Sequence, residues 1–141
     1  MKVPKWAEYI FREVCDTYNL YPTPQLVWRR RRSKKIKPMF PDEIPTTRPK
    51  PKYSGGVAYV KDNKIVITAG KDRKDQKLVL LHELAHMISP PEEYHGRIFW
   101  ETAWKLYRQY KVPLRYAYKR EGEYRTLSKV IYRQLRNSRN E

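Results

Sequence analysis

The sequence contains very little cysteine and no long apolar run. Cys15 is the single cysteine among 141 residues, so the chain can form neither an internal disulfide nor a cysteine-based zinc site of its own. No stretch approaches the roughly 18 apolar residues that span a bilayer, and the first residues, MKVPKWAEYI, lack the apolar core of a signal peptide. We therefore expect a cytoplasmic protein without a membrane partner. Association with the nucleoid is an alternative, and in a eukaryote the protein would be nuclear.

Acidic residues are scarce relative to basic ones. The chain has 15 Asp and Glu against 31 Lys and Arg, a formal net charge of +16. Such an excess repels itself unless an anion is nearby, and nucleic acid is the commonest anionic partner. Apolar residues at 40% and aromatics at 13% nevertheless indicate a packed interior. The length predicts a single domain over residues 1–141, with a monomer as the expected state.

The spacing of apolar residues predicts an α+β fold. The helix that begins at Asp72 is apolar almost all round, so we expect it at the centre of the fold. Segment 33–54 holds five prolines and is predicted to be a long basic loop, and residues 115–141 to be a basic C-terminal extension. The expected elements are a helix at 4–18, a strand at 26–31, an antiparallel hairpin of 57–60 and 65–68 turning at Asp62-Asn63, helices from Asp72 to before Pro90, from about 92–94 to 110 and at 126–137, and an extended stretch at 114–118.

A five-residue motif on the predicted central helix carries the chemistry. In His82-Glu83-Leu84-Ala85-His86 the two histidines are one turn apart, about 6 Å in rise and on one face, so both imidazoles can reach one ion. Glu83 projects beside that face. There it can accept a proton from a water whose pKa the metal has lowered and pass it to the leaving amine. The motif predicts a Zn²⁺ site with Glu83 as the catalytic base.

A catalytic zinc needs three protein ligands and one open position. The remaining histidine of the chain is His95. Pro90-Pro91 allows the chain to reverse, so that the His95 imidazole can arrive from the next segment, and Gly96 would let the backbone pass close to the site. We therefore predict His82, His86 and His95 as the metal ligands.

Other interpretations of these residues remain open. Glu92, Glu93 and Glu101 are alternative third ligands, with Glu101 the strongest because a helical glutamate completes some zinc sites of this type. The motif could also have arisen by chance, or it could hold a purely structural metal. Glu83 argues against a structural metal, because a closed site needs no carboxylate that is not a ligand.

Two stretches of the sequence are Val79-Leu80-Leu81-His82-Glu83-Leu84-Ala85-His86 and Tyr94-His95-Gly96-Arg97-Ile98-Phe99-Trp100. Together they resemble the SprT/Spartan-like zincin metallopeptidases, in which a zinc helix is followed by a histidine-glycine pair and aromatic residues. The resemblance covers about residues 55–110, and the related WLM and minigluzincin-like peptidases are alternatives. It implies a compact zincin-like domain with a small antiparallel sheet packed on the zinc helix and helices at both ends. It also implies zinc-dependent cleavage of proteins, often proteins bound or crosslinked to DNA.

The resemblance has further implications and two departures. In zincins a strand edge beside the metal helix pairs with the substrate, which here points to 57–60 or 65–68; Tyr94, Arg97 and Tyr107 are candidates for stabilising the oxyanion. The chain lacks the C-terminal zinc ribbon of many SprT-like proteins, since residues 116–119 contain no cysteine. The gap between His86 and His95 is shorter than in several members.

Basic residues gather around the proline-rich loop. With Trp28, Phe40 and Tyr53 interleaved as stacking platforms, they predict binding of single-stranded or distorted DNA. The alternative is an ordinary solvated basic face. A second basic patch is Arg125, Lys129, Arg133, Arg136 and Arg139. The predicted nucleic-acid-binding residues are Arg29, Arg30, Arg31, Arg32, Lys34, Lys35 and Lys37.

Three functions fit these residues. The first is a zinc metallopeptidase that cleaves proteins associated with DNA. The second is a catalytically silent DNA-binding module that keeps a zincin scaffold, which an intact Glu83 disfavours. The third is a peptidase unrelated to DNA, whose charge selects acidic substrates.

Overall fold

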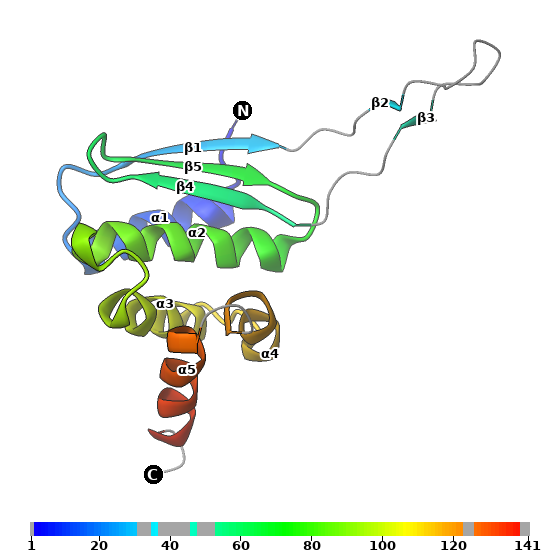
Figure 1. Cartoon of the computed structure of the whole chain (residues 1–141). Helices are drawn as coiled ribbons and strands as arrows, with labels where there is room; N and C mark the ends of the chain where they lie inside the picture. The colour runs from blue at the N-terminus through cyan, green and yellow to red at the C-terminus, as the bar shows by residue number, and fades with distance from the viewer. Residues whose placement is uncertain (1, 31–34, 37–45, 48–52, 123–125, 139–141) are drawn as a thin grey trace.

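The computed structural model describes residues 2–30, 35–36, 46–47, 53–122 and 126–138, and it has an α+β fold in layers (Figure 1). A three-stranded sheet forms one layer, with α1 (Lys5–Thr17) and α2 (Arg73–Ile88) against one of its faces. Beyond α2 lie α3 (Arg97–Gln109), α4 (Leu114–Ala117) and α5 (Thr126–Ser138). The α2 helix is therefore covered on both sides, as its apolar sequence predicts. Within the described ranges, no helix combines the length and apolar character needed to cross a membrane.

The sheet has strand order β1-β5-β4 and is mixed. β4 (Gly55–Tyr59) and β5 (Lys64–Ala69) form the predicted antiparallel hairpin. At its turn Asn63 has a φ of 50°, the left-handed conformation that asparagine tolerates well. β1 (Gln25–Arg30) pairs parallel to β5, so the small sheet expected to be antiparallel is mixed. An alternating pattern shows that a segment is a strand but does not identify its partner.

Several predicted elements need correction. Residues 114–118 are not extended: α4 and a π-helical turn, η2 (Tyr118–Gly122), occupy them. The helix predicted from 92–94 starts at Arg97, after a separate 3₁₀ turn, η1 (Pro91–Glu93). Most of segment 33–54 lies outside the described residues; within it β2 (Lys35–Ile36) and β3 (Thr46–Thr47) pair antiparallel.

The apolar residues of the α5 helix are not all buried. Ile131 is buried, but Leu127 and Val130 are 36% and 38% exposed. Ser128 is buried in their place and accepts a 3.0 Å hydrogen bond from the indole Nε1 of Trp104 in α3. That contact joins two buried polar groups, so the helix is docked by a hydrogen bond as well as by apolar packing.

Candidate metal centre and active-site cleft

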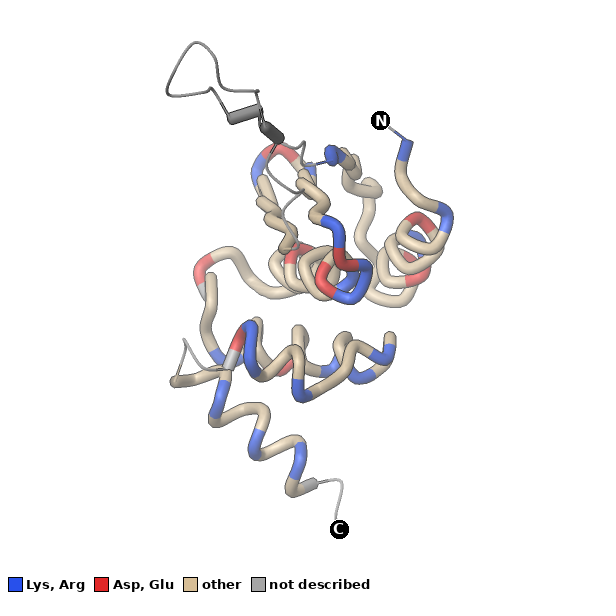
Figure 2. Tube along the Cα trace, turned by 90° about the vertical axis from the view of Figure 1, so that its right-hand side faces the viewer, with Lys and Arg blue, Asp and Glu red and all other residues tan. Residues whose placement is uncertain are grey.

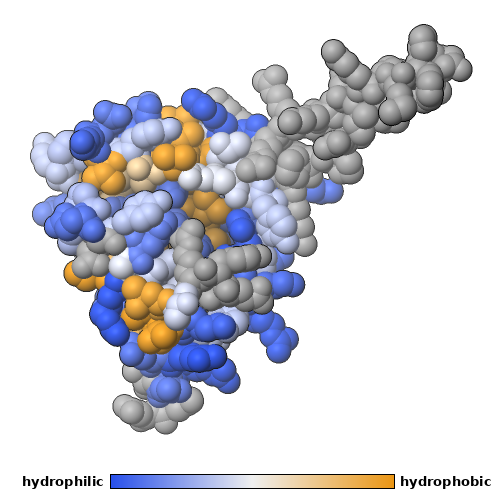
Figure 3. Space-filling view, in the orientation of Figure 1, coloured by the Kyte–Doolittle hydropathy of each residue, from blue (hydrophilic) through white to orange (hydrophobic). Residues whose placement is uncertain are grey.

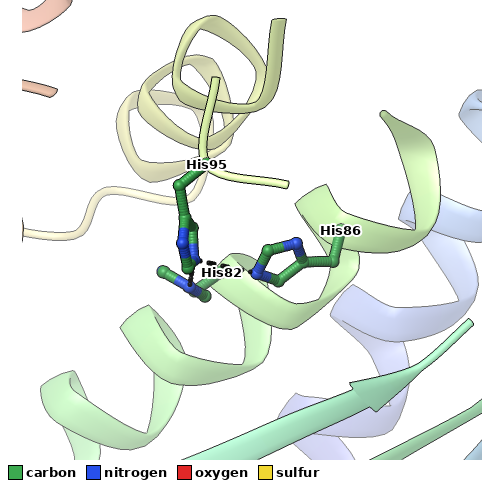
Figure 4. Close-up of side chains that lie close together, drawn as sticks. All are labelled: His82, His86 and His95. Carbon is green, nitrogen blue, oxygen red and sulfur yellow. Dashed lines mark hydrogen bonds between the residues drawn. The ribbon is translucent and has the colours of Figure 1, made fainter. Parts of the chain in front are cut away.

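Three imidazoles meet between α2 and α3 (Figure 4). His82 and His86 lie one turn apart on α2, and His95 reaches them from the segment between η1 and α3. The Nε2 atom of His95 lies 3.1 Å from Nε2 of His86 and 3.3 Å from Nε2 of His82. The structure thus brings together the three histidines that the sequence predicts as ligands.

The geometry of this cluster fits a metal ion such as zinc. Nitrogens that bind one zinc at 2.0 to 2.1 Å in tetrahedral directions are about 3.3 Å apart, which matches the two measured distances. Nδ1 of His82 lies 2.7 Å from the Oε1 atom of Glu121. A proton shared along that contact leaves the Nε2 lone pair of His82 directed at the other two rings. The cluster could therefore bind a metal through three imidazole nitrogens.

Two of the glutamates considered as third ligands, Glu92 and Glu101, are not part of this cluster. The Glu101 carboxylate accepts a hydrogen bond from Arg97 at 3.1 Å, and its side chain is 50% exposed. Glu92 is exposed as well, and the side chain of Glu93 lies outside the described residues. Geometry therefore favours His95 over Glu101 as the third member of the site.

Aromatic rings hold the imidazoles in place. Phe99, fully buried in α3, stacks on His86 with ring centroids 4.2 Å apart, and the equally buried Trp100 stacks on His95 at 5.7 Å. Tyr94 also stacks on His86, with ring centroids 5.5 Å apart, and is exposed, with a φ of 45°. A positive φ is uncommon for tyrosine, so the strained residue of this turn immediately precedes a predicted ligand. Gly96, the next residue but one, has an ordinary φ of −83°.

Glu83 and the three imidazoles line a 370 Å³ cleft. The Glu83 side chain is largely buried, and its Oε1 atom lies 4.0 Å from Nε2 of His82. Residues of β4, including Gly56 and Val57, and the Pro90-Pro91 pair line the same cleft. A carboxylate and three imidazoles thus face a space beside a strand at the edge of the sheet.

Sequence reasoning missed two residues of the site, Glu121 and Gly56. Glu121 lies 39 residues after His82, in a stretch that was expected to follow an extended segment, and no motif marks it. Tyr107 was considered only for the oxyanion, yet its hydroxyl donates to Glu121 at 3.2 Å. Gly56 carried a usable signal, because glycine within a strand often marks close backbone approach.

The predicted nucleic-acid-binding residues are only partly described. Arg29 and Arg30 are exposed at the end of β1. Arg31, Arg32, Lys34 and Lys37 lie outside the described residues; Lys35 is in β2, but its side chain is not described. Figure 2 shows Lys and Arg, and no Asp or Glu, along α5. Of the second predicted patch, Lys129, Arg133 and Arg136 belong to this helix, whereas Arg125 and Arg139 are not described.

The surface is mainly hydrophilic on the face shown in Figure 3, with separate apolar areas over the sheet and near the junction of α3 and α5. Exposed apolar side chains on these elements include Val57 of β4, Ile98 of α3 and Val130 of α5.

Comparison with known proteins adds no relative: no family model, no curated protein and no solved structure matches this chain. Functional inference therefore depends on the residues and geometry of the site.

Proposed function

We propose that this protein is a zinc-dependent peptidase that hydrolyses peptide bonds by activating water, and that it acts on proteins associated with DNA. One observation carries the proposal: Glu83 and the three imidazoles face the same cleft, beside the β4 edge of the sheet. The resemblance of residues 79–86 and 94–100 to SprT-like zincins supports the same activity. A purely structural metal site has no need of a carboxylate in this position.

The chain's own residues have distinct roles in this reaction. His82, His86 and His95 would hold the metal, which when bound supplies Lewis-acid chemistry by polarising the peptide carbonyl and lowering the pKa of a water. Glu83 accepts the proton of the attacking water and delivers it to the leaving amine. Because this carboxylate is 5% exposed, it works in a site from which most bulk water is excluded.

The β4 strand is the proposed binding edge for the substrate backbone. β5 is paired on both sides, to β1 and to β4, whereas β4 pairs with β5 alone among the described strands. Its outer edge can therefore add an extended peptide as a further strand. Since Val57 and Ala58 of β4 also line the cleft, such a peptide would pass beside Glu83. Unfolded protein segments are the substrates that fit this mode.

The link to DNA rests on charge. The net charge is +16, and Arg29 and Arg30 are exposed at one end of the sheet. Phosphate neutralisation by such residues supplies most non-specific affinity for nucleic acid. A peptidase indifferent to DNA is the alternative, and cleavage that does not respond to added DNA would favour it.

The test of peptidase activity compares wild-type protein with Glu83→Gln on an unfolded protein substrate. We expect the variant to retain its zinc and to lose activity by about 10²-fold or more, since general acid–base catalysis contributes roughly 10²- to 10⁴-fold. Glu101→Gln is the matched control, because Glu101 is exposed and lies outside the histidine cluster. Equal activity of wild type and Glu83→Gln would contradict the proposal, and zinc binding without cleavage in either would favour the silent DNA-binding module.

A further inference from the structure

A buried carboxylate in the first turn of α2 binds three separate parts of the chain. Asp75 is fully buried. Its Oδ2 atom accepts a 2.5 Å hydrogen bond from the backbone N–H of Ser54, and its Oδ1 atom accepts from the Tyr116 hydroxyl and, at 2.7 Å, from Nε of Arg120. A buried charge is tolerated only when it is paired and hydrogen-bonded in this way. Asp75 does not cap the helix; the N-cap is Asp72, which accepts a hydrogen bond from the backbone N–H of Lys74 at 3.0 Å.

The π-helical turn η2 attaches to α2 at a second point. Arg120 binds Asp75, and the next residue, Glu121, binds Nδ1 of His82 at 2.7 Å. Asp75 and His82 are seven residues apart, so they lie two turns apart on one face of α2. Two adjacent side chains of η2 therefore fasten that turn along the same face that carries the metal-binding imidazoles.

The Glu121 carboxylate also binds a residue of α3. The Tyr107 hydroxyl of α3 donates to its Oε1 atom at 3.2 Å and lies 3.5 Å from Nδ1 of His82. Glu121 is 7% exposed, so water competes little for these contacts. A carboxylate fixed in this way sets both the tautomer and the ring orientation of His82.

We propose that Arg120 is a positioning residue for the metal centre, acting through Glu121 on His82, with Asp75 as its anchor. The inference deepens the proposed function and depends on the histidine cluster binding zinc. Because Asp75 also accepts from Ser54, the chain that emerges from segment 33–54 is tied to the same anchor. The metal centre thus depends on two residues, Asp75 and Arg120, that do not touch the imidazole cluster.

The experiment is a double-mutant cycle on zinc affinity, measured by competition with a chromophoric chelator. Loss of an outer-shell partner of a zinc ligand typically weakens metal affinity about 10- to 100-fold, and we expect Glu121→Gln to fall in that range. We expect Arg120→Met to weaken affinity by about threefold to tenfold, since it acts one contact further out. In the Glu121→Gln background, Arg120→Met should add almost nothing, because residues that act through one contact are not additive.

Controls separate positioning from a loss of folding. Arg115→Met removes an exposed arginine of the neighbouring α4 and should leave zinc affinity unchanged. Arg120→Lys keeps the charge opposite Asp75 but not the planar fork of donors; it should remain folded and still weaken zinc binding, and it decides the question if Arg120→Met does not fold. Co²⁺ absorption bands of the wild type and Arg120→Lys should differ if the His82 ring has turned.

The outcomes distinguish this inference from the proposed function. Additive effects of Arg120→Met and Glu121→Gln, or a zinc affinity in Arg120→Lys equal to that of the wild type, would overturn the positioning role while leaving the peptidase proposal intact. If the wild-type protein bound no zinc or cobalt, both proposals would fail. If zinc binding responded as expected but no peptide were cleaved, the positioning role would stand and the peptidase proposal would fall.

Discussion

Gly56 of β4 lies so close to Glu83 of α2 that a Cβ atom at position 56 would be 2.9 Å from the Glu83 Cγ atom. The same Cβ would be 2.8 Å from Cγ1 of Val79. Real Cβ atoms do not tolerate contacts under 3.0 Å, so only glycine allows the edge strand to approach the helix this closely. The position of Glu83, the proposed base, relative to β4, the proposed binding edge for the substrate, thus requires glycine at position 56.

Gly56→Ala should therefore impair catalysis more than it impairs metal binding. The added methyl group must displace Glu83, Val79 or the strand, and a displacement of about 1 Å at a reacting group can cost about 10²-fold in rate. We expect the turnover rate to fall about tenfold to hundredfold, zinc content to stay near that of wild type, and stability to fall by about 1–3 kcal/mol from overpacking. Steady-state kinetics, elemental analysis and urea unfolding on the same preparations measure all three.

The matched control for that variant is Gly55→Ala. Gly55 is the neighbouring residue of β4 and its side chain would point to the opposite face of the strand; its φ is not positive. This control should retain activity. A Gly56→Ala enzyme as active as the wild type would show that the close approach of β4 to Glu83 is not needed for catalysis.

His95→Ala should remove most of the bound zinc, whereas Glu101→Ala should not. The Nε2 atom of His95 lies within 3.3 Å of the Nε2 atoms of both other histidines. The Glu101 carboxylate instead accepts a hydrogen bond from Arg97. Elemental analysis of protein purified without added metal should give about one zinc per chain for wild type and for Glu101→Ala, as expected for a single three-histidine site. Retention of zinc by His95→Ala with loss in Glu101→Ala would instead identify the glutamate as the ligand.

The cluster of three histidines could be predicted because its members are close in the sequence. His82 and His86 occupy one face of a helix, and a proline break followed by one more histidine leaves few places for the third imidazole. The apolar sequence of α2 likewise predicts its central place in the fold, and the Asp62-Asn63 turn predicts the β4–β5 hairpin.

The contacts that were not predicted join distant parts of the chain. β1 pairs in parallel with β5, almost 40 residues later, and Glu121 reaches His82 across 39 residues. Such pairings depend on how the whole chain packs, and neither periodicity nor turn residues encode them. The prediction for residues 114–118 was wrong for a related reason. Tyrosine favours a strand, but Tyr116 lies in the short helix α4 and donates a hydrogen bond to Asp75. Buried hydrogen bonding outweighs local propensity there.

The unfolding free energy should fall at alkaline pH through Cys15. Burial, with a smaller contribution from Asp16, raises the pKa of this thiol from 9.0 to about 11. Between these two values the unfolded chain has released a proton that the folded chain still holds, so stability is complete below pH about 9 and declines as the pH rises towards 11. A shift of this size corresponds to at most about 3 kcal/mol. Urea unfolding of wild type and Cys15→Ala across this range should give curves whose separation changes with pH; parallel curves would refute the assignment.

The exposed arginines at the end of β1 should contribute to DNA binding in a salt-dependent way. Each phosphate contact to a single strand contributes about 0.7 to the slope of log affinity against log salt. The double variant Arg29→Gln/Arg30→Gln should therefore bind a single-stranded oligonucleotide more weakly, with a slope smaller by about 1.4 if both side chains contact phosphates. Fluorescence anisotropy over a series of salt concentrations measures the slope directly.

A second double variant, with the same loss of charge at another place on the surface, decides whether DNA affinity depends on the position of the two arginines or only on net charge. Lys2→Gln/Lys5→Gln removes two exposed cations at the start of α1, and it should leave the slope near that of the wild type because neither lysine belongs to the predicted DNA-binding residues. Equal losses in both double variants would mean that net charge attracts DNA without a defined contact at β1. Long-range attraction of that kind would weaken the proposal that the substrates are proteins bound to DNA. Without a defined contact, DNA would not orient the cleft beside β4 towards a protein bound to the same DNA molecule.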